Sequence, residues 1–124
     1  VPYPFDSQPF SAAKARSGSD PGTVRLLNNY QQERYDKQKV EEKLRPVLKF
    51  RSRYNVPIYC GEFGANRDAP MPGWANWNRD VIELLQRYQF EYAFWEYRGS
   101  FGLMSFDSTE IDPRKLDAIG FRQG

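Results

Sequence analysis

The sequence has no histidine and only one cysteine among its 124 residues. Histidine is the commonest metal ligand and the usual general base, so its absence excludes zinc-dependent hydrolysis and Ser-His-Asp catalysis. The single cysteine, Cys60, cannot form a disulfide within the chain. It lies in an apolar segment, which indicates a small buried side chain rather than a reactive thiol. We therefore expect no metal site and no cofactor.

The sequence also lacks long apolar runs and a strong charge of either sign. No stretch approaches the roughly 20 apolar residues that a membrane-spanning helix needs. The chain does not begin with basic residues followed by an apolar run, so no signal peptide is expected in it. The net charge is +2, from 18 basic and 16 acidic residues that are interspersed along the chain. Without a basic patch or an apolar span, neither nucleic acid nor a membrane is an expected partner.

Aromatic side chains are abundant, at 16% of the sequence, with nine Phe, eight Tyr and three Trp. Exposed aromatic rings stack on sugars or on bases. The alternative for any one ring is packing in the core. Core or loop packing is predicted for Trp74 and Trp77, because they lie on or just before a predicted helix.

The first third of the chain divides into a proline-rich part and a helical part. Residues 1–22 are predicted to form a long loop, because proline removes a backbone donor and fixes the backbone. Over residues 36–54, apolar positions recur at spacings of three, four and seven, which predicts a helix with one buried stripe. Pro46 is expected to bend or split this helix.

The rest of the chain alternates between strand and helix patterns. We expect a strand at 56–62, a helix at 74–88, a strand at 90–97 and a short helix at 112–119. The first strand is apolar without strict alternation, as is typical of a parallel strand covered on both faces. Such alternation predicts βαβ units, an α/β fold with a parallel sheet. A TIM (β/α)8 barrel needs eight such units and about 250 residues, so this chain corresponds to a partial barrel.

Glu62 is the first candidate for chemistry, because it lies at the end of the first predicted strand, between Gly61 and Gly64. Residues at the carboxyl ends of barrel strands carry the chemistry of such enzymes. A carboxylate that acts on sugars needs a second carboxyl group facing it. The structural alternative is an ion pair between Glu62 and either Arg67 or Arg98.

Two motifs in this order resemble a known family. They are Gly61-Glu62-Phe63-Gly64 at the first strand tip and Trp95-Glu96-Tyr97-Arg98 at the second. Together with the helices around them and Phe101-Gly102-Leu103, they resemble the C-terminal part of glycoside hydrolase family 5, the cellulase and endoglucanase family. The resemblance covers essentially the whole chain, as a single unit over 1–124.

The resemblance implies strands seven and eight of a (β/α)8 barrel, with flanking helices, from an enzyme that hydrolyses β-1,4-linked glucans or mannans with retention of configuration. Glu62 falls on the catalytic nucleophile of the family, and Trp95 falls on the tryptophan that forms the floor of the sugar site. Phe63, Asn66 and Arg98 are expected to bind substrate. The implied partner is a β-linked polysaccharide or oligosaccharide, and the implied location is extracellular.

One part of the family pattern is missing. The general acid/base of the family is the glutamate of an Asn-Glu-Pro motif, which does not occur here. Glu96 is the only candidate to replace it, but it follows Trp95 directly, and successive strand residues point to opposite faces. We therefore expect the chain to be inactive alone. It would form homo-oligomers or be completed by an N-terminal fragment. The alternative is a β-glycan-binding or structural remnant without catalysis.

Overall fold

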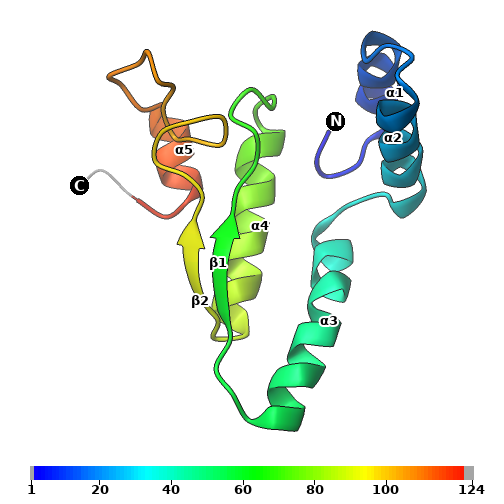
Figure 1. Cartoon of the computed structure of the whole chain (residues 1–124). Coiled ribbons are helices and arrows are strands. Elements are labelled where there is room, and N and C mark those ends of the chain that lie inside the picture. Colours follow the sequence, from blue (N-terminus) through cyan, green and yellow to red (C-terminus); the bar gives the residue numbers. More distant parts are fainter. Residues whose placement is uncertain (1, 122–124) are drawn as a thin grey trace.

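The computed structural model describes residues 2–121, and residues 1 and 122–124 of the predicted unit lie outside that range. The chain folds as helices α1 (Ser7–Arg16), α2 (Pro21–Glu33) and α3 (Lys37–Tyr54), strand β1 (Tyr59–Phe63), helix α4 (Gly73–Arg87), strand β2 (Glu91–Phe94) and helix α5 (Pro113–Ala118). Figure 1 shows α1 and α2 as a helical hairpin joined by α3 to the part that contains both strands. From residue 36 onward, the predicted order of elements is confirmed.

The predicted loop over 1–22 is wrong, because α1 and the start of α2 lie within it. Asp6 caps α1 by accepting a hydrogen bond from the Gln8 amide at 2.9 Å, and Asp20 caps α2 through Thr23 at 2.8 Å. Pro21 occupies the first turn of α2, where a backbone N–H has no helical partner to lose. Pro9 and Pro21 therefore lie near the starts of helices, where proline does not prevent a helix.

Helix α3 begins and ends at residues suited to those positions. The Asp36 side chain accepts a hydrogen bond from the Lys39 amide at 2.8 Å, which satisfies a donor of the first turn. Asn55 ends the helix with φ of 50°, a left-handed conformation that asparagine tolerates. Pro46 lies inside the helix without splitting it.

The two strands form a parallel pair with one irregularity. Tyr59 pairs with Glu91, Cys60 with Tyr92, and Phe63 with Phe94. From the second pair to the third, β1 advances three residues (60 to 63) and β2 advances two (92 to 94). The extra residue of β1 therefore lies at Gly61–Glu62. This extra residue keeps Cys60 and Phe63 on the same face of the sheet. Their partners, Tyr92 and Phe94, are two residues apart in β2 and therefore point to the same face.

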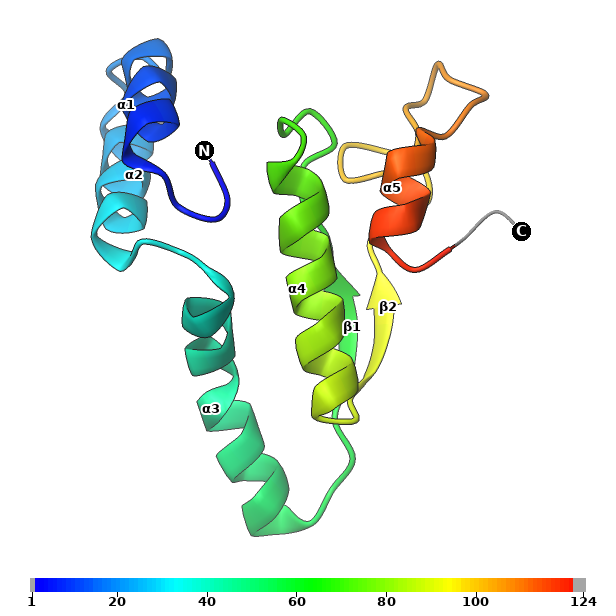
Figure 2. The same cartoon turned by 180° about the vertical axis from the view of Figure 1, so that it is seen from behind.

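Helix α4 covers one face of this pair and forms the core with it. Figure 2 shows α4 in front of the strands, and Figure 1 shows the strands in front of α4 from the opposite side. The core contains the buried residues Phe63, Trp74, Ala75, Val81, Ile82, Leu85, Phe90, Leu103, Ala118 and Ile119. Ala118 lies in α5, and Ile119 is the C-cap of that helix. At the other end of α5, the N-cap Asp112 accepts a hydrogen bond from the Arg114 amide at 2.9 Å.

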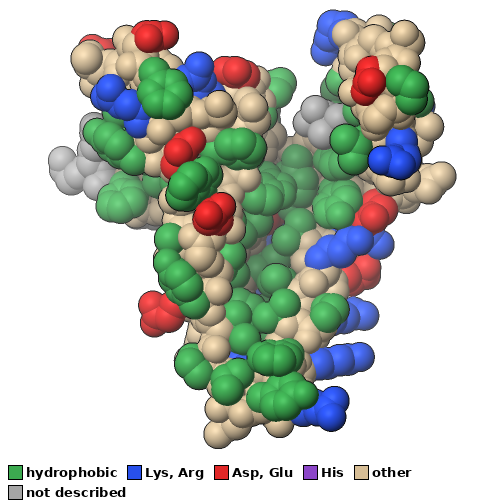
Figure 3. All heavy atoms as spheres, viewed as in Figure 1, with side chains coloured by type: hydrophobic (Ala, Val, Ile, Leu, Met, Phe, Trp, Pro, Cys, Tyr) green, Lys and Arg blue, Asp and Glu red, His purple; other side chains and the backbone are tan. Residues whose placement is uncertain are grey.

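The opposite face of the sheet is open. The sequence predicts that β1 is covered on both faces, and this prediction is wrong, because residues 2–121 cover only the α4 side. The Tyr59 side chain is 65% exposed, and Phe50 and Tyr54 of α3 are 51% and 53% exposed. Figure 3 shows hydrophobic side chains gathered on this side of the molecule, between the strands and α3. We call this side of the β1–β2 pair the open face.

The N-terminal segment is joined to α4 by a polar contact. The Tyr3 hydroxyl donates a hydrogen bond to Asp80 Oδ2 at 2.7 Å, and Lys37 forms an ion pair with the same carboxylate at 3.8 Å. Burial, and the charge of Asp80, raise the pKa of Tyr3. Among the described helices, none is both long and apolar enough to cross a membrane.

Substitution of a core leucine tests this assignment. Leu85 is 2% exposed, so Leu85→Ala should lower the free energy of unfolding by about 2 to 5 kcal/mol, because it leaves a cavity. Leu26 on α2 is 68% exposed, and Leu26→Ala should change it by less than about 0.5 kcal/mol. Urea unfolding followed by circular dichroism measures both. Equal effects would contradict this core.

Candidate active site

Glu62 lies in the irregular part of β1, one residue before the strand ends at Phe63. Because Phe63 points into the core, the Glu62 side chain points to the open face, where it is exposed. The structure does not pair it with either arginine considered from the sequence. Arg67 forms an ion pair with Asp68 at 3.4 Å, and the Arg98 guanidinium donates to the Phe106 carbonyl at 3.5 Å. Within residues 2–121, Glu62 forms no ion pair.

Trp95 follows the last residue of β2 and lies beside Glu62. Its backbone N–H donates a hydrogen bond to the Phe63 carbonyl at 2.7 Å, which ties the two strand ends together. Its side chain is 46% exposed. A shallow hollow of about 250 Å³ is lined by Glu62, Phe63, Gly64, Trp95 and Phe101. The structure thus brings together the two residues that the motifs singled out.

Gly64 permits this close approach of the strand ends. A Cβ atom at Gly64 would lie 1.9 Å from the carbonyl oxygen of Trp95. No side chain fits at that distance, so any other residue here would force the two strand tips apart.

Phe63 lines the hollow, but its ring packs in the core, and its role as a substrate-binding side chain stays a prediction. Phe63 is 8% exposed. Its ring centroid lies 5.7 Å from those of Tyr92 and Phe94 and 6.5 Å from that of Trp77. Phe63 therefore supports the strand ends from the helix side of the sheet.

Two other predicted binding residues are not brought to the hollow. Asn66 Oδ1 accepts a hydrogen bond from the Asp68 amide at 2.9 Å, and the residue lines a separate aromatic cavity of about 310 Å³. Arg98 follows the strand and directs its guanidinium to Phe106 and to the sulfur of Met104, at 3.6 Å. Their contact with a substrate stays a prediction.

Phe101 also lines the hollow, and the sequence does not single it out there, although it belongs to the Phe101-Gly102-Leu103 motif. It is 39% exposed and lines the hollow with Glu62 and Trp95. The available signal was an aromatic residue in the loop that follows a strand tip. Sequence alone does not tell which of the aromatic residues in that region turns back toward the strand.

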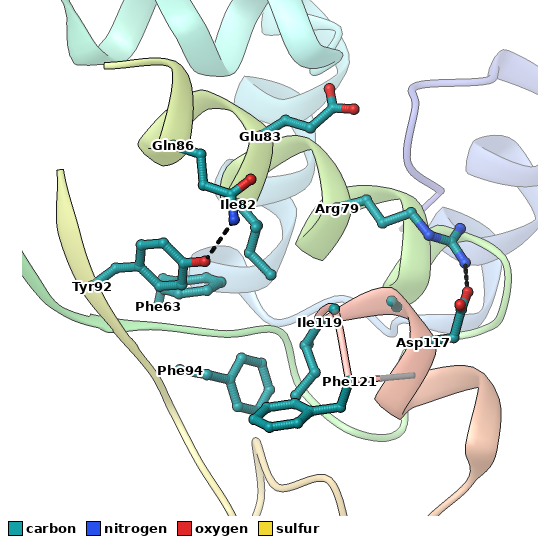
Figure 4. Close-up of a pocket in the computed structure, with 12 residues that line it drawn as sticks. Phe63, Arg79, Ile82, Glu83, Gln86, Tyr92, Phe94, Asp117, Ile119 and Phe121 are labelled. Carbon is teal, nitrogen blue, oxygen red and sulfur yellow. Dashed lines mark hydrogen bonds and ion pairs between the residues drawn. The ribbon is translucent and has the colours of Figure 1, made fainter. Parts of the chain in front are cut away.

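A larger cavity lies on the helix side of the sheet, between α4, β2 and α5 (Figure 4). Its volume is about 780 Å³. Arg79 Nη2 donates to Asp117 at 2.9 Å, and Gln86 Nε2 donates to the Tyr92 hydroxyl at 3.1 Å. These polar groups are already partnered, and Glu62 is not among the lining residues. We therefore do not include this cavity in the candidate site.

Two structural assignments made from the sequence agree with the geometry. Trp74 is 1% exposed, and its indole N–H donates to the Ala65 carbonyl at 3.1 Å, so its role is packing. Cys60 is partly buried in β1, and burial raises the pKa of its thiol. No cluster of three or more potential metal ligands occurs in the part of the chain that is described.

The fold of the described residues resembles part of solved TIM-barrel proteins. Thermotoga maritima Cel5A, solved in complex with cellobiose, matches at a TM-score of 0.61 with 23% identity, over 67% of this chain and 27% of that one. A hyperthermophilic endo-β-1,4-glucanase in complex with substrate matches at a TM-score of 0.58 with 30% identity, over 68% and 27%. These neighbours are family 5 proteins with the TIM-barrel fold.

The curated relatives give a narrower class. Endoglucanase C of Acetivibrio thermocellus and endoglucanase C307 of Clostridium sp. (strain F1) are each 33% identical over 98 residues, which is 78% of this chain. The homologues of this chain are therefore endoglucanases of the glycoside hydrolase family 5 type, as the motifs predicted. The chain spans 28% of the length of these relatives. No family model matches it.

Replacement of Gly64 tests the close approach of the strand ends. Gly64→Ala should destabilise the protein by about 1 to 3 kcal/mol, because the new methyl group overlaps the Trp95 carbonyl. Gly61→Ala is the matched control, since the nearest atom to a Cβ there, apart from the adjacent residues, belongs to the flexible ring of Tyr59 at 3.5 Å. Thermal unfolding measures both variants. If Gly64→Ala is as stable as Gly61→Ala, the strand ends are not in this arrangement.

Proposed function

We propose that this chain carries the nucleophile of a retaining glycoside hydrolase that acts on β-1,4-linked glucan. The observation that carries the proposal is the position of Glu62 and Trp95, at the carboxyl ends of two adjacent parallel strands and in one hollow. The identity of the relatives as endoglucanases supports it. So do the solved complexes of T. maritima Cel5A with cellobiose and with mannotriose.

The chemistry assigns different roles to the two residues. In a retaining mechanism, the Glu62 carboxylate attacks the anomeric carbon and forms a covalent glycosyl intermediate. The exposed Trp95 ring stacks on the apolar face of the sugar beside it. A second carboxyl group, about 5 to 5.5 Å from the nucleophile, protonates the leaving oxygen and then activates water.

That second carboxyl group must come from another segment. Among residues 2–121, Glu62 is the only carboxylate in the lining of the hollow. We propose that β1 and β2 are the seventh and eighth strands of a (β/α)8 barrel. The segment that carries the earlier strands supplies the acid/base. Loss of leaving-group protonation typically costs about 10²- to 10⁴-fold in rate, so these residues alone are inactive.

The open face is where that segment would bind. It presents exposed apolar side chains, and within residues 2–121 the two strands pair only with each other, so both outer edges are available for further strands. In a closed barrel, an N-terminal partner covers this face and places its own carboxylate opposite Glu62. The substrate class, an insoluble or extended polysaccharide, implies action outside the cell.

Reconstitution tests the catalytic role. We expect this chain, mixed with a piece of a related endoglucanase that carries the earlier strands, to hydrolyse soluble β-1,4-glucan. Glu62→Gln should lower that rate by at least about 10³-fold, because the amide is a poor nucleophile. Glu91→Gln changes another exposed carboxylate of the strand pair and should leave the rate within about twofold. Release of reducing sugar is the measurement.

Hydrolysis that survives Glu62→Gln would refute the assignment of the nucleophile.

A second candidate function is supported by the single carboxylate in the hollow: a β-glycan-binding or structural remnant that self-associates through its open sheet edges. It would be favoured if no mixture turns over substrate. Glycan binding would then persist in Glu62→Gln and be lost in Trp95→Ala.

Self-association of the isolated chain has its own test. An uncovered apolar face favours association, so sedimentation at micromolar concentration should detect a species heavier than the monomer. Tyr59→Lys places a charge on the open face and should weaken this association. Leu26→Lys, at an equally exposed position on α2, should not. A stable, well-folded monomer in the wild-type chain would contradict this expectation.

A further inference from the structure

The carboxylate of Glu96 is bound to the loop that follows β2. The Phe101 backbone N–H donates a hydrogen bond to Glu96 Oε1 at 3.5 Å. The backbone of Gly99 lies directly against the same carboxylate, because a Cβ atom there would be 2.1 Å from Oε1. Gly99 also has φ of 147°, a conformation that favours glycine. The loop is thus shaped to accept the Glu96 side chain.

The backbone of Glu96 holds the same loop at two further points. Its N–H donates to the Phe101 carbonyl at 3.4 Å, and its carbonyl accepts from the Leu103 amide at 3.0 Å. Within residues 2–121, no lysine or arginine forms an ion pair with the Glu96 carboxylate. The side chain therefore interacts with the loop backbone rather than with a cation.

Phe101 is the part of this loop that reaches the hollow. Its Cβ lies 3.8 Å from the position that a Cβ of Gly64 would occupy, next to the strand tip that carries Glu62. Phe101 is 39% exposed and Trp95 is 46% exposed, so two partly exposed aromatic residues adjoin the Glu62 carboxylate. Partly exposed rings beside a polar group are typical of a site that binds the apolar face of a ligand.

We propose that Glu96 is a positioning residue that fixes Phe101 as an aromatic wall of the hollow, and that Phe101 contributes to binding the sugar next to Glu62. Glu96 therefore acts through Phe101 and does not serve as the missing acid/base. The identity of the ligand as a β-1,4-glucan rests on the proposed function. The contact between Glu96 and the loop does not.

A double-mutant cycle on this chain tests the proposal, with cellotetraose as the probe and calorimetry as the measurement. Phe101→Ala and Glu96→Ala should each weaken binding about 3- to 10-fold, because each removes the aromatic wall. The double variant should bind no more weakly than Phe101→Ala, since residues that act through one contact are not additive. Glu96→Gln keeps an acceptor oxygen and should bind within about twofold of wild type.

The control is Glu91→Ala, which removes an exposed glutamate from the start of the same strand and should leave binding unchanged. Additive effects of Glu96→Ala and Phe101→Ala would overturn the proposal. Binding by Glu96→Gln as weak as that by Glu96→Ala would also overturn it. In that case the charge of Glu96 acts on the sugar directly.

A second measurement, without sugar, separates the contact from the function. In Glu96→Ala, hydrogen exchange of the Phe101 amide should accelerate at least about fivefold, because its acceptor is gone, while the amides of Leu84 and Leu85 in α4 keep their rates. Glu96→Gln should exchange as wild type does. An unchanged Phe101 amide in Glu96→Ala overturns the positioning role. A responsive amide in a chain that does not bind cellotetraose overturns only the proposed ligand.

Discussion

The ends of the two strands approach so closely that only glycine fits between them. A methyl group on Gly64 would overlap the Trp95 carbonyl, and the Trp95 N–H donates to Phe63 across the same gap. This contact places Glu62, at the end of one strand, beside an aromatic ring from the next. The hollow depends on this contact, because the two side chains come from segments that are separated by the whole of α4.

The irregularity at Gly61–Glu62 complements that contact. One extra residue in β1 allows Phe63 to pack against α4 while Glu62 turns to the open face. A charged carboxylate is tolerated there because it is solvated, whereas burial without a partner would be costly. The same local feature thus stabilises the core through Phe63 and leaves the Glu62 carboxylate exposed in the hollow.

The open face connects the stability of this chain with its chemistry. Apolar side chains of β1 and α3 lie uncovered on the side of the sheet where Glu62 is exposed. In the proposed barrel, one partner segment covers that surface and supplies the second carboxyl group. Folding and catalysis would then be completed together, which agrees with a chain that spans 28% of the length of its relatives.

The sequence by itself determined α3, the two strands and the helices that follow them, because apolar spacing and capping residues act locally. Its two motifs also identified Glu62 and Trp95. It did not predict α1 and α2, since proline is unfavourable inside a helix but tolerated in a first turn, and the proline content alone does not tell the two apart. Only the tertiary structure decided that Phe63 packs in the core, that Asn66 lies elsewhere and that Phe101 joins the hollow. Those positions depend on strand register and loop closure, which are set by contacts between distant residues.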